Sequence, residues 1–315
     1  MRKKDLLLVL AGNDTQLASA EAELLLGEHA ERDERLCRIR SREAGLTRLA
    51  YTREAHEILH TCQPSQLEAN LRKIRINETT FLARTHRGIT ITGGMAGSIL
   101  KENNPASTVE LTNPKGQYHV FSFNGMCCIT RLIWRNDEDF NGRRSHLRPG
   151  GCPISLHPRL ARCMVNLTGA KQGTIIDPCC GTGGMLIEAG LMGLHPVGFD
   201  IEQDMIARSQ KALEHFNIPG RIAVKDCRDI RQHYRYLVTD IPYGRNTAPT
   251  HRDFIPRFMD MLSRVVTQRA VISAASEQKI PIPANCGLLH EFPYYIHKSL
   301  TKKLYVIDII RKHRA

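Results

Sequence analysis

The chain has 315 residues, of which 42% are apolar and 24% charged, a mixture typical of soluble globular proteins and long enough for two domains. No apolar run approaches the roughly 20 residues of a membrane-spanning helix, so we expect no membrane association. Lysine and arginine exceed aspartate and glutamate, which gives a net charge of +12. This excess favours a polyanionic partner, most simply nucleic acid, although a merely basic enzyme would also show it.

The ten cysteines do not follow the pattern of a secreted disulfide scaffold at this chain length. Two pairs are adjacent, Cys127–Cys128 and Cys179–Cys180, and neither Cys-x-x-Cys nor another zinc-binding spacing occurs. The 14 histidines are scattered and include no His-Glu-x-x-His motif. The sequence therefore predicts reduced, mostly buried thiols, no bound metal and a cytoplasmic location.

Residues 1–14 are first basic and then apolar, as in a signal peptide, but Asp5 interrupts them, so we interpret 5–11 as a first strand. Asp14 then caps a predicted helix that ends at Gly27. Further patterns predict a helix at 52–62 and strands at 36–40, 46–51, 81–84, 109–112, 117–123 and 126–135. Glycine, asparagine and proline separate several of these segments, which together predict an α+β region.

Single basic residues are spread through this first half, at Arg72, Lys73, Arg75, Arg84, Arg87 and Arg131. Such residues on strands often form only a solvated face. The segment FLARTHR at 81–87 is nevertheless similar to a core strand of the THUMP domain of RNA-modifying enzymes. The resemblance implies a THUMP-type RNA-binding region preceded by a ferredoxin-like element, with Arg84 and Arg87 in contact with RNA.

Residues 136–157 are polar and rich in glycine, proline and arginine, which is typical of a linker. We therefore predict an N-terminal region at 1–140, a linker at 141–154 and a C-terminal domain at 155–315. The linker is made positive by Arg143, Arg144, His146 and Arg148. These side chains could bind RNA phosphates, or they could only keep a connecting segment soluble.

The most informative stretch is TIIDPCCGTGGMLIEAG, at 174–190. Its β-branched start predicts a buried strand, its glycines a tight turn and its apolar end a helix, the order found in nucleotide-binding sheets. Glycine lets a ligand approach the backbone, and a helix N-terminus offers free N–H groups. Asp177 would repel a pyrophosphate here, whereas it would attract a sulfonium cofactor with an α-amino group.

The segment DPCCGTGG at 177–184 resembles the first motif of class I S-adenosylmethionine-dependent methyltransferases. Together with the predicted helix at 157–167 and the Leu-Thr-Gly that ends it, the segment resembles archaeal tRNA guanine-N2 methyltransferases. In that family the helix precedes and partly lines the cofactor pocket. The resemblance implies that S-adenosylmethionine binds at His157, Arg159, Asp177, Cys179, Gly181, Thr182, Gly183, Asp200, Ile201, Asp226 and Cys227.

Two of these acids have alternatives that the residues leave open. Asp200 ends a predicted strand at 196–200, where a carboxylate accepts hydrogen bonds from ribose hydroxyls, but NAD is held in the same way. Asp226 follows a predicted strand, at the position where the family contacts the adenine amine. It could instead be a helix N-cap, and Asp229 competes with it for the adenine contact.

A second motif, DIPYG at 240–244, follows another predicted strand and resembles the Asp/Asn-Pro-Pro-Tyr motif of methyltransferases that act on planar amines. Such an amine is a poor nucleophile because its lone pair is delocalised into the ring. Asp240 and a carbonyl beside Pro242 would accept its hydrogens, and Tyr243 would stack on the extruded base. Ile241 stands where the family usually has proline, and in isolation the motif could be an ordinary turn.

The end of the chain predicts a helix at 252–266, a strand at 270–274 and an antiparallel hairpin of 291–296 with 304–310. Such a terminal pair is expected of the methyltransferase fold. The intervening segment, 297–303, is basic, and it could contact RNA or form a solvated turn.

These features predict an α/β protein with a Rossmann-like class I methyltransferase domain, a mostly parallel sheet with an antiparallel C-terminal strand, after the THUMP-type region. The resemblance implies methylation of the exocyclic N2 amine of a guanosine in tRNA, at position ten, once or twice, with a small zinc-binding activator protein as partner. Three rivals stay open: a ribosomal RNA or DNA amine methyltransferase, an NAD oxidoreductase, and a non-catalytic RNA-binding protein. The oxidoreductase lacks its third glycine and leaves the DIPYG motif unexplained.

Overall fold

The computed structural model describes residues 3–12, 14–152, 155–242, 253–298 and 300–310. It divides the chain into an N-terminal unit (Met1–Thr47 and Tyr51–Asp137) and a C-terminal unit (Arg48–Ala50 and Glu138–Ala315). Each unit is built on one sheet with its own apolar core. The segment predicted as a linker lies within the C-terminal unit.

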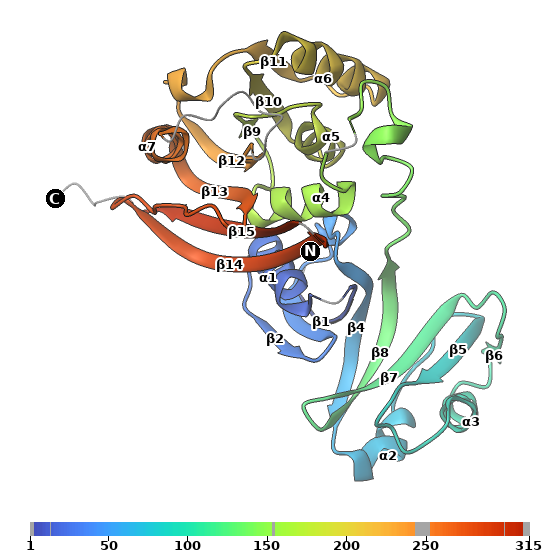
Figure 1. Ribbon diagram of the computed structural model, residues 1–315. Helices are drawn as coiled ribbons and strands as arrows, with labels where there is room; N and C mark the ends of the chain where they lie inside the picture. Colours follow the sequence, from blue (N-terminus) through green and yellow to red (C-terminus); the bar gives the residue numbers. More distant parts are fainter. Residues whose placement is uncertain (1–2, 13, 153–154, 243–252, 299, 311–315) are drawn as a thin grey trace. The chain divides into compact units, whose positions relative to one another are not determined.

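The N-terminal unit contains an eight-stranded sheet of order β2-β3-β1-β4-β8-β7-β5-β6 (Figure 1). Its strands are β1 (Lys4–Leu10), β2 (Ala30–Asp33), β3 (Leu36–Ser41), β4 (Thr52–Cys62), β5 (Thr80–Thr85), β6 (Thr108–Val109), β7 (Gly116–Phe123) and β8 (Met126–Arg135). Its helices are α1 (Thr15–Leu26), α2 (Leu67–Leu71) and α3 (Gly93–Asn103). The long strand β4 pairs with β1 on one side and β8 on the other, and so joins the two halves of the sheet.

Two predictions for this unit are wrong. Residues 52–62 form strand β4 rather than a helix, and 46–51 contain a short 3-10 turn rather than a strand. Register shifts at Ala55/His56 and Ile58/His60 interrupt the regular alternation of side chains between the two faces of β4. The apolar residues of β4 therefore recur every three to four residues, as they do on one face of a helix. Pairing with two neighbouring strands then overrides the local pattern.

Two further differences concern short or glycine-containing segments of the same unit. The strand expected at 109–112 is reduced to the two residues of β6. Helix α3 was not predicted, because the glycines in its first half are poor helix formers. The remaining strands expected in this unit are confirmed at nearly the predicted bounds.

The C-terminal unit contains a seven-stranded sheet of order β11-β10-β9-β12-β13-β15-β14. Its strands are β9 (Thr174–Asp177), β10 (His195–Asp200), β11 (Arg221–Val224), β12 (Tyr234–Asp240), β13 (Val266–Ala275), β14 (Cys286–His297) and β15 (Leu300–Ile309). Its helices are α4 (Pro158–Leu167), α5 (Gly184–Leu191), α6 (Gln203–His215) and α7 (Phe254–Val265). The first five strands of this order run parallel, and β15 pairs antiparallel with β13 on one side and with β14 on the other, so the antiparallel terminal pair that the sequence predicts is present.

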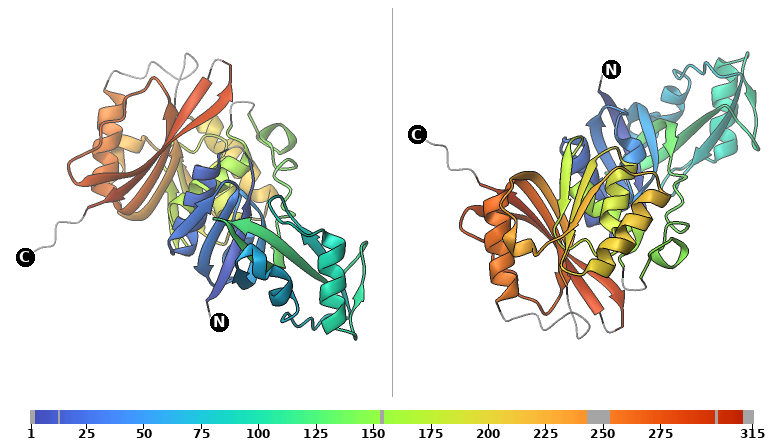
Figure 2. Two further views of the ribbon diagram at one scale, coloured as in Figure 1. Left: turned by 90° about the horizontal axis from the view of Figure 1, so that it is seen from below. Right: turned by 90° about the horizontal axis from the view of Figure 1, so that it is seen from above.

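Helices cover both faces of this sheet, and each face has its own apolar core. Leu186 of α5 and Leu213 of α6 belong to one core, and Phe258 and Leu262 of α7 belong to the other. Figure 2 shows α6 and α7 on opposite sides of the strands. The sheet is therefore the middle layer of a three-layer α/β domain, whose ligands are expected at the carboxyl ends of the strands.

Within the described part of the chain, no helix combines the length and the apolar character that crossing a membrane requires.

Candidate active site

Three aspartates end three neighbouring parallel strands of the C-terminal unit. Asp177 ends β9, Asp200 ends β10 and Asp240 ends β12. Strand β9 lies between β10 and β12, so the strands that follow β9 in the chain are placed first on one side of it and then on the other. Such a reversal of strand order opens a crevice at the carboxyl edge of the sheet. The structure thus brings these three predicted site residues to one edge.

Asp177 is a buried acid that fixes the start of the glycine turn. Its Oδ1 accepts hydrogen bonds from Thr239 Oγ1 of β12 at 2.6 Å and from Cys179 N at 3.1 Å. Burial raises the pKa of Asp177 to about 7, although these two hydrogen bonds act in the opposite direction. The carboxyl group therefore ties the end of β9 to β12, a function that the sequence did not predict.

The turn between β9 and α5 depends on two glycines with positive φ angles. Gly181 has φ +49° and Gly183, the N-cap residue of α5, has φ +79°. A Cβ atom on Gly183 would lie 2.5 Å from Ser209 Oγ, whereas one on Gly181 would meet no protein atom within 4 Å. The backbone at Gly181 therefore faces open space, where a ligand can approach it.

Asp200 holds this turn from the neighbouring strand. Its Oδ2 accepts a hydrogen bond from Gly181 N at 2.8 Å, and its Oδ1 accepts one from Glu202 N at 3.0 Å. Each carboxylate oxygen has a second lone pair, so Asp200 can still accept a ligand hydroxyl. The next residue, Ile201, is a large apolar side chain that is 58% exposed. Its position beside the acid offers an apolar surface for a planar group.

The two cysteines predicted in the cofactor site are neighbours in the structure. Cys179 follows β9, Cys227 begins the 3-10 turn η4 (Cys227–Asp229), and both pack in the same apolar core. The adjacent Cys227 thiol, through a side-chain hydrogen bond, and burial raise the pKa of Cys179 well above its usual range. All ten cysteines are free, and the contact of Cys179 and Cys227 with the cofactor stays a prediction.

Asp226 has the geometry of a helix N-cap, the role that the sequence left open as an alternative to the adenine contact. It is the N-cap of η4, and its Oδ1 accepts a hydrogen bond from Arg228 N at 2.9 Å. The Arg228 guanidinium also donates to both carboxylate oxygens, which holds the pKa of Asp226 below its usual value. The adenine contact of Asp226 stays a prediction, and the competitor Asp229 is exposed.

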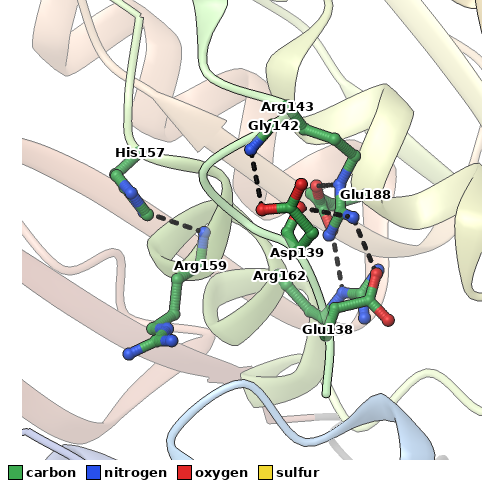
Figure 3. A network of polar contacts seen from close by, with 8 residues as sticks. All are labelled: Glu138, Asp139, Gly142, Arg143, His157, Arg159, Arg162 and Glu188. Atoms are coloured by element: carbon green, nitrogen blue, oxygen red, sulfur yellow. Dashed lines mark hydrogen bonds and ion pairs between the residues drawn. The ribbon is translucent and has the colours of Figure 1, made fainter. Parts of the chain in front are cut away.

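The arginines of the predicted linker are used mainly inside the C-terminal unit. Arg148 is buried and donates to Thr182 O at 2.8 Å and to Thr182 Oγ1 at 3.2 Å, so it supports the glycine turn. Arg143 and Arg162 each donate through Nε to Glu188 of α5 at 2.8 Å (Figure 3). Both guanidinium groups of Arg143 and Arg148 thus have partners within this unit, and their contacts with RNA stay a prediction. Arg144 is exposed.

Glu188 is the central acid of this network, and its charge is compensated by two arginines. It is 1% exposed, while Arg162 is 4% and Arg143 12% exposed. We expect Glu188→Gln to lower the free energy of unfolding by about 3 kcal/mol in urea titration, because two buried cations lose their counter-charge. The matched control is Glu138→Gln, which removes a 34% exposed partner of the same arginines and should cost less than about 1 kcal/mol. Equal losses would contradict this assignment.

His157 and Arg159 begin helix α4. His157 is the N-cap, and its Nδ1 accepts a hydrogen bond from Arg159 N at 3.2 Å. Its burial, with the charges of Arg144 and Arg159, lowers the pKa of His157. The Arg159 guanidinium lies over the ring of Phe140, 5.0 Å from its centroid. These contacts explain both residues as parts of the fold, and their cofactor contact stays a prediction.

Asp240, the predicted catalytic acid, forms an ion pair that the sequence analysis missed. Lys302 Nζ of β15 lies 2.6 Å from Asp240 Oδ1 and 2.5 Å from Oδ2. Lys302 is 1% exposed. Burial raises the pKa of Asp240 and lowers that of Lys302, while the attraction between the two charges opposes both changes. The lysine therefore favours the ionised form of Asp240.

The sequence placed Lys302 and Lys303 in a hairpin loop, but both lie on β15. Lys303 pairs with Glu291 of β14 at 2.8 Å. The hairpin connection is correspondingly shorter than the predicted 297–303, between His297 and Leu300. The signal for Lys302 was hidden because two adjacent lysines normally indicate a solvated turn. Only the sheet order, which places β15 beside β13 and next but one to β12, brings Lys302 to Asp240.

The residues after Asp240 explain why isoleucine replaces the family's proline. Ile241 N donates a hydrogen bond to Ser273 O at 2.8 Å, and the Ile241 side chain is completely buried. Proline could not donate this bond. Pro242 O accepts a long bond from Gln278 Nε2 at 3.4 Å, which leaves the carbonyl free to accept another hydrogen. Tyr243 lies outside the described residues.

Comparisons with known proteins agree with this domain. Residues 145–284 match the UPF0020 family model, described as an RMKL-like methyltransferase domain. The chain also resembles the crystal structure of TrmN from Thermus thermophilus, with a TM-score of 0.51 over 97% of this chain and 99% of that one, at 16% identity. At this identity the likeness establishes the fold alone, which is that of a Rossmann-like methyltransferase.

Two curated relatives identify the family. The chain is 35% identical over 67% of its length to a tRNA (guanine(10)-N2)-dimethyltransferase of Methanothermobacter thermautotrophicus, of which it covers 66%, just under two thirds. It is 36% identical over 47% of its length to a probable tRNA (guanine(10)-N2)-dimethyltransferase of Methanothermococcus thermolithotrophicus, of which it covers 96%. The chain belongs to the family of these proteins.

Proposed function

We propose that this protein transfers methyl groups from S-adenosylmethionine to the exocyclic N2 amine of a guanosine in tRNA, at position ten. The observation that carries the proposal is the ion pair between the half-buried Asp240 and the buried Lys302, at the carboxyl end of β12 and beside the glycine turn after β9. The names of the curated relatives support the substrate. Formation of both N2-methylguanosine and N2,N2-dimethylguanosine is part of the proposal.

The crevice at β9 and β10 fits S-adenosylmethionine. Asp200 would accept the ribose hydroxyls, Ile201 would pack on the adenine, and the backbone at Gly181 would contact the amino acid portion. The open space at Gly181 and the exposed Ile201 side chain beside Asp200 support this assignment. When bound, the cofactor supplies a methyl group on a positively charged sulfur.

Asp240 would activate the amine. Its carboxylate, whose ionised form Lys302 favours, would accept one hydrogen of the N2 group, and Pro242 O would accept the other. Both contacts favour a tetrahedral nitrogen whose lone pair is available for attack. The burial of Lys302 and the partial burial of Asp240 strengthen these contacts, because water screens them less. The remaining contribution of the domain is to hold the amine in line with the methyl carbon.

The N-terminal unit would dock the tRNA as a THUMP-type region. Arg84 and Arg87 are exposed at the end of β5 and after it, where RNA phosphates could reach them. Arg144 and the net charge of +12 would add to this attraction. We place the protein in the cytoplasm, since its ten free thiols suit a reducing compartment. A small zinc-binding activator protein is the expected partner.

The proposal is tested by incubating the protein with unmodified tRNA transcripts and methyl-labelled S-adenosylmethionine. We expect label in the tRNA, with little transfer to ribosomal RNA or DNA. Retained tRNA binding without transfer, by a protein that binds the cofactor in calorimetry, would indicate a missing activator, and the assay would then be repeated with one added. Binding of tRNA without cofactor binding would overturn the proposal in favour of a non-catalytic RNA-binding protein.

A further inference from the structure

A cluster of polar side chains crosses the sheet of the N-terminal unit, and the proposed methyl transfer does not use it. Glu54 and His56 belong to β4 and His119 to β7, and between these strands lies β8 with Thr130. His56 is 0% and His119 1% exposed. Their ring centroids are 4.7 Å apart. Two buried imidazoles so close to one carboxylate need a physical explanation.

The hydrogen bonds of Thr130 determine which nitrogen of His56 carries a proton. The Thr130 hydroxyl donates its hydrogen to His119 O at 3.1 Å. Its oxygen also lies 3.3 Å from His56 Nδ1, so with the hydroxyl hydrogen directed to His119 O the donor of this second contact is His56 Nδ1. A neutral His56 therefore carries its proton on Nδ1 and presents a lone pair at Nε2.

That lone pair faces another acceptor. His56 Nε2 lies 3.2 Å from Glu54 Oε2, while Arg135 donates to Glu54 Oε1 through Nε at 3.1 Å and Nη2 at 3.0 Å and so fixes the carboxylate. Two acceptors at this distance repel each other unless a cation lies between them. A proton on His56 Nε2 or a metal ion would remove this repulsion, and the first could also come with the Thr130 hydroxyl turned toward His56 Nδ1.

His119 distinguishes the two possibilities. Glu54, His56 and His119 each offer one atom that could bind a metal ion, and these three atoms lie within 4.8 Å of one another. The buried Nε2 of His119 has no hydrogen-bond partner among the residues that the structure describes. A proton on His56 would satisfy Glu54 and leave His119 without a partner, whereas a metal ion would engage all three.

We propose that Glu54, His56 and His119 bind a divalent transition-metal cation of the zinc type. Two imidazoles and one carboxylate form a ligand set that zinc accepts, with water completing the coordination. Tetrahedral zinc places such ligand atoms about 3.4 Å apart, close to the present His56–Glu54 distance. His86, which is exposed, pairs with His119 Nδ1 at 3.0 Å and would orient that ring as an outer partner. The ion would connect β4 and β7 across β8.

The test uses the full chain, stripped of metal with a chelator and titrated with Co²⁺, which shows visible absorption bands when it binds imidazole. We expect about one cobalt per chain in the wild type. His119→Asn and Glu54→Gln should weaken binding by at least about 100-fold. His60→Asn, on the same strand but outside the cluster, is the matched control and should bind as the wild type does. Circular dichroism checks that each variant is folded.

Two results would overturn the proposal. Absence of stoichiometric cobalt binding by the wild type would leave a direct hydrogen bond between His56 Nε2 and Glu54 as the explanation. Equal binding by the wild type and the folded Glu54→Gln and His119→Asn variants would place the cobalt elsewhere. In the latter case a near-ultraviolet thiolate charge-transfer band would identify cysteines as the ligands. Both results are independent of methyl transfer, which is measured separately.

Discussion

Replacement of Asp240 by asparagine is expected to slow methyl transfer by about 100- to 10,000-fold, the range for loss of a positioned acceptor in general base catalysis. The amide has nearly the same shape as the carboxylate, but it carries no charge and cannot take up the proton that the amine loses. Single-turnover assays with saturating tRNA and cofactor would measure the chemical step without contributions from binding.

The same substitution leaves Lys302 buried beside a neutral group, so lost stability must be separated from lost chemistry. The double variant Asp240→Asn with Lys302→Met removes both charges and is the matched control. It should recover most of the stability that the single variant loses, but none of the activity. If the double variant recovered activity as well, Asp240 would have no direct part in the reaction.

Replacement of Lys302 by methionine has the second large expected effect. Burial already raises the pKa of Asp240, and Lys302 is the charge that lowers it, so removal of Lys302 raises this pKa further. The carboxyl group must be ionised to accept the amine hydrogen. We therefore expect about 100-fold lower activity at neutral pH and an acid limb of the pH–rate profile that moves to higher pH.

The Lys302→Arg variant keeps the positive charge and should retain much of the activity, with an acid limb near that of the wild type. Lys303→Met, at the adjacent and partly exposed position of β15, is the control for damage to the strand. A uniform decrease of activity at every pH in Lys302→Met would show that the lysine only supports packing and does not control the ionisation of Asp240.

Much of the C-terminal unit could be predicted because its signals are local. The strand, glycine turn and helix at 174–190 and the acid at the end of β12 each depend on residues that are adjacent in the chain. Glycines with positive φ angles and a strand that ends in aspartate produce recognisable short motifs. Parallel strands then bring those ends together by topology alone.

The features that were missed depend on contacts between distant residues. Lys302 reaches Asp240 only because β15 inserts beside β13, and the helix expected at 52–62 becomes β4 only because β1 and β8 pair with it. The residues Glu54, His56 and His119 have no sequence spacing that would indicate a metal site, since they belong to two strands that are separated in the sheet by a third. Arg148 looked solvated because its partner Thr182 lies in another element.

The most direct test of the account is the identity of the nucleoside that receives the methyl group. Labelled tRNA would be digested and its nucleosides separated, for a wild-type transcript and for one carrying inosine, which lacks the N2 amine, in place of guanosine at position ten. We predict label in N2-methylguanosine and N2,N2-dimethylguanosine with the first transcript, and none at that position with the second. Label on another atom of the base, or undiminished transfer to the inosine transcript, would contradict the assignment of Asp240 to the N2 amine of guanine.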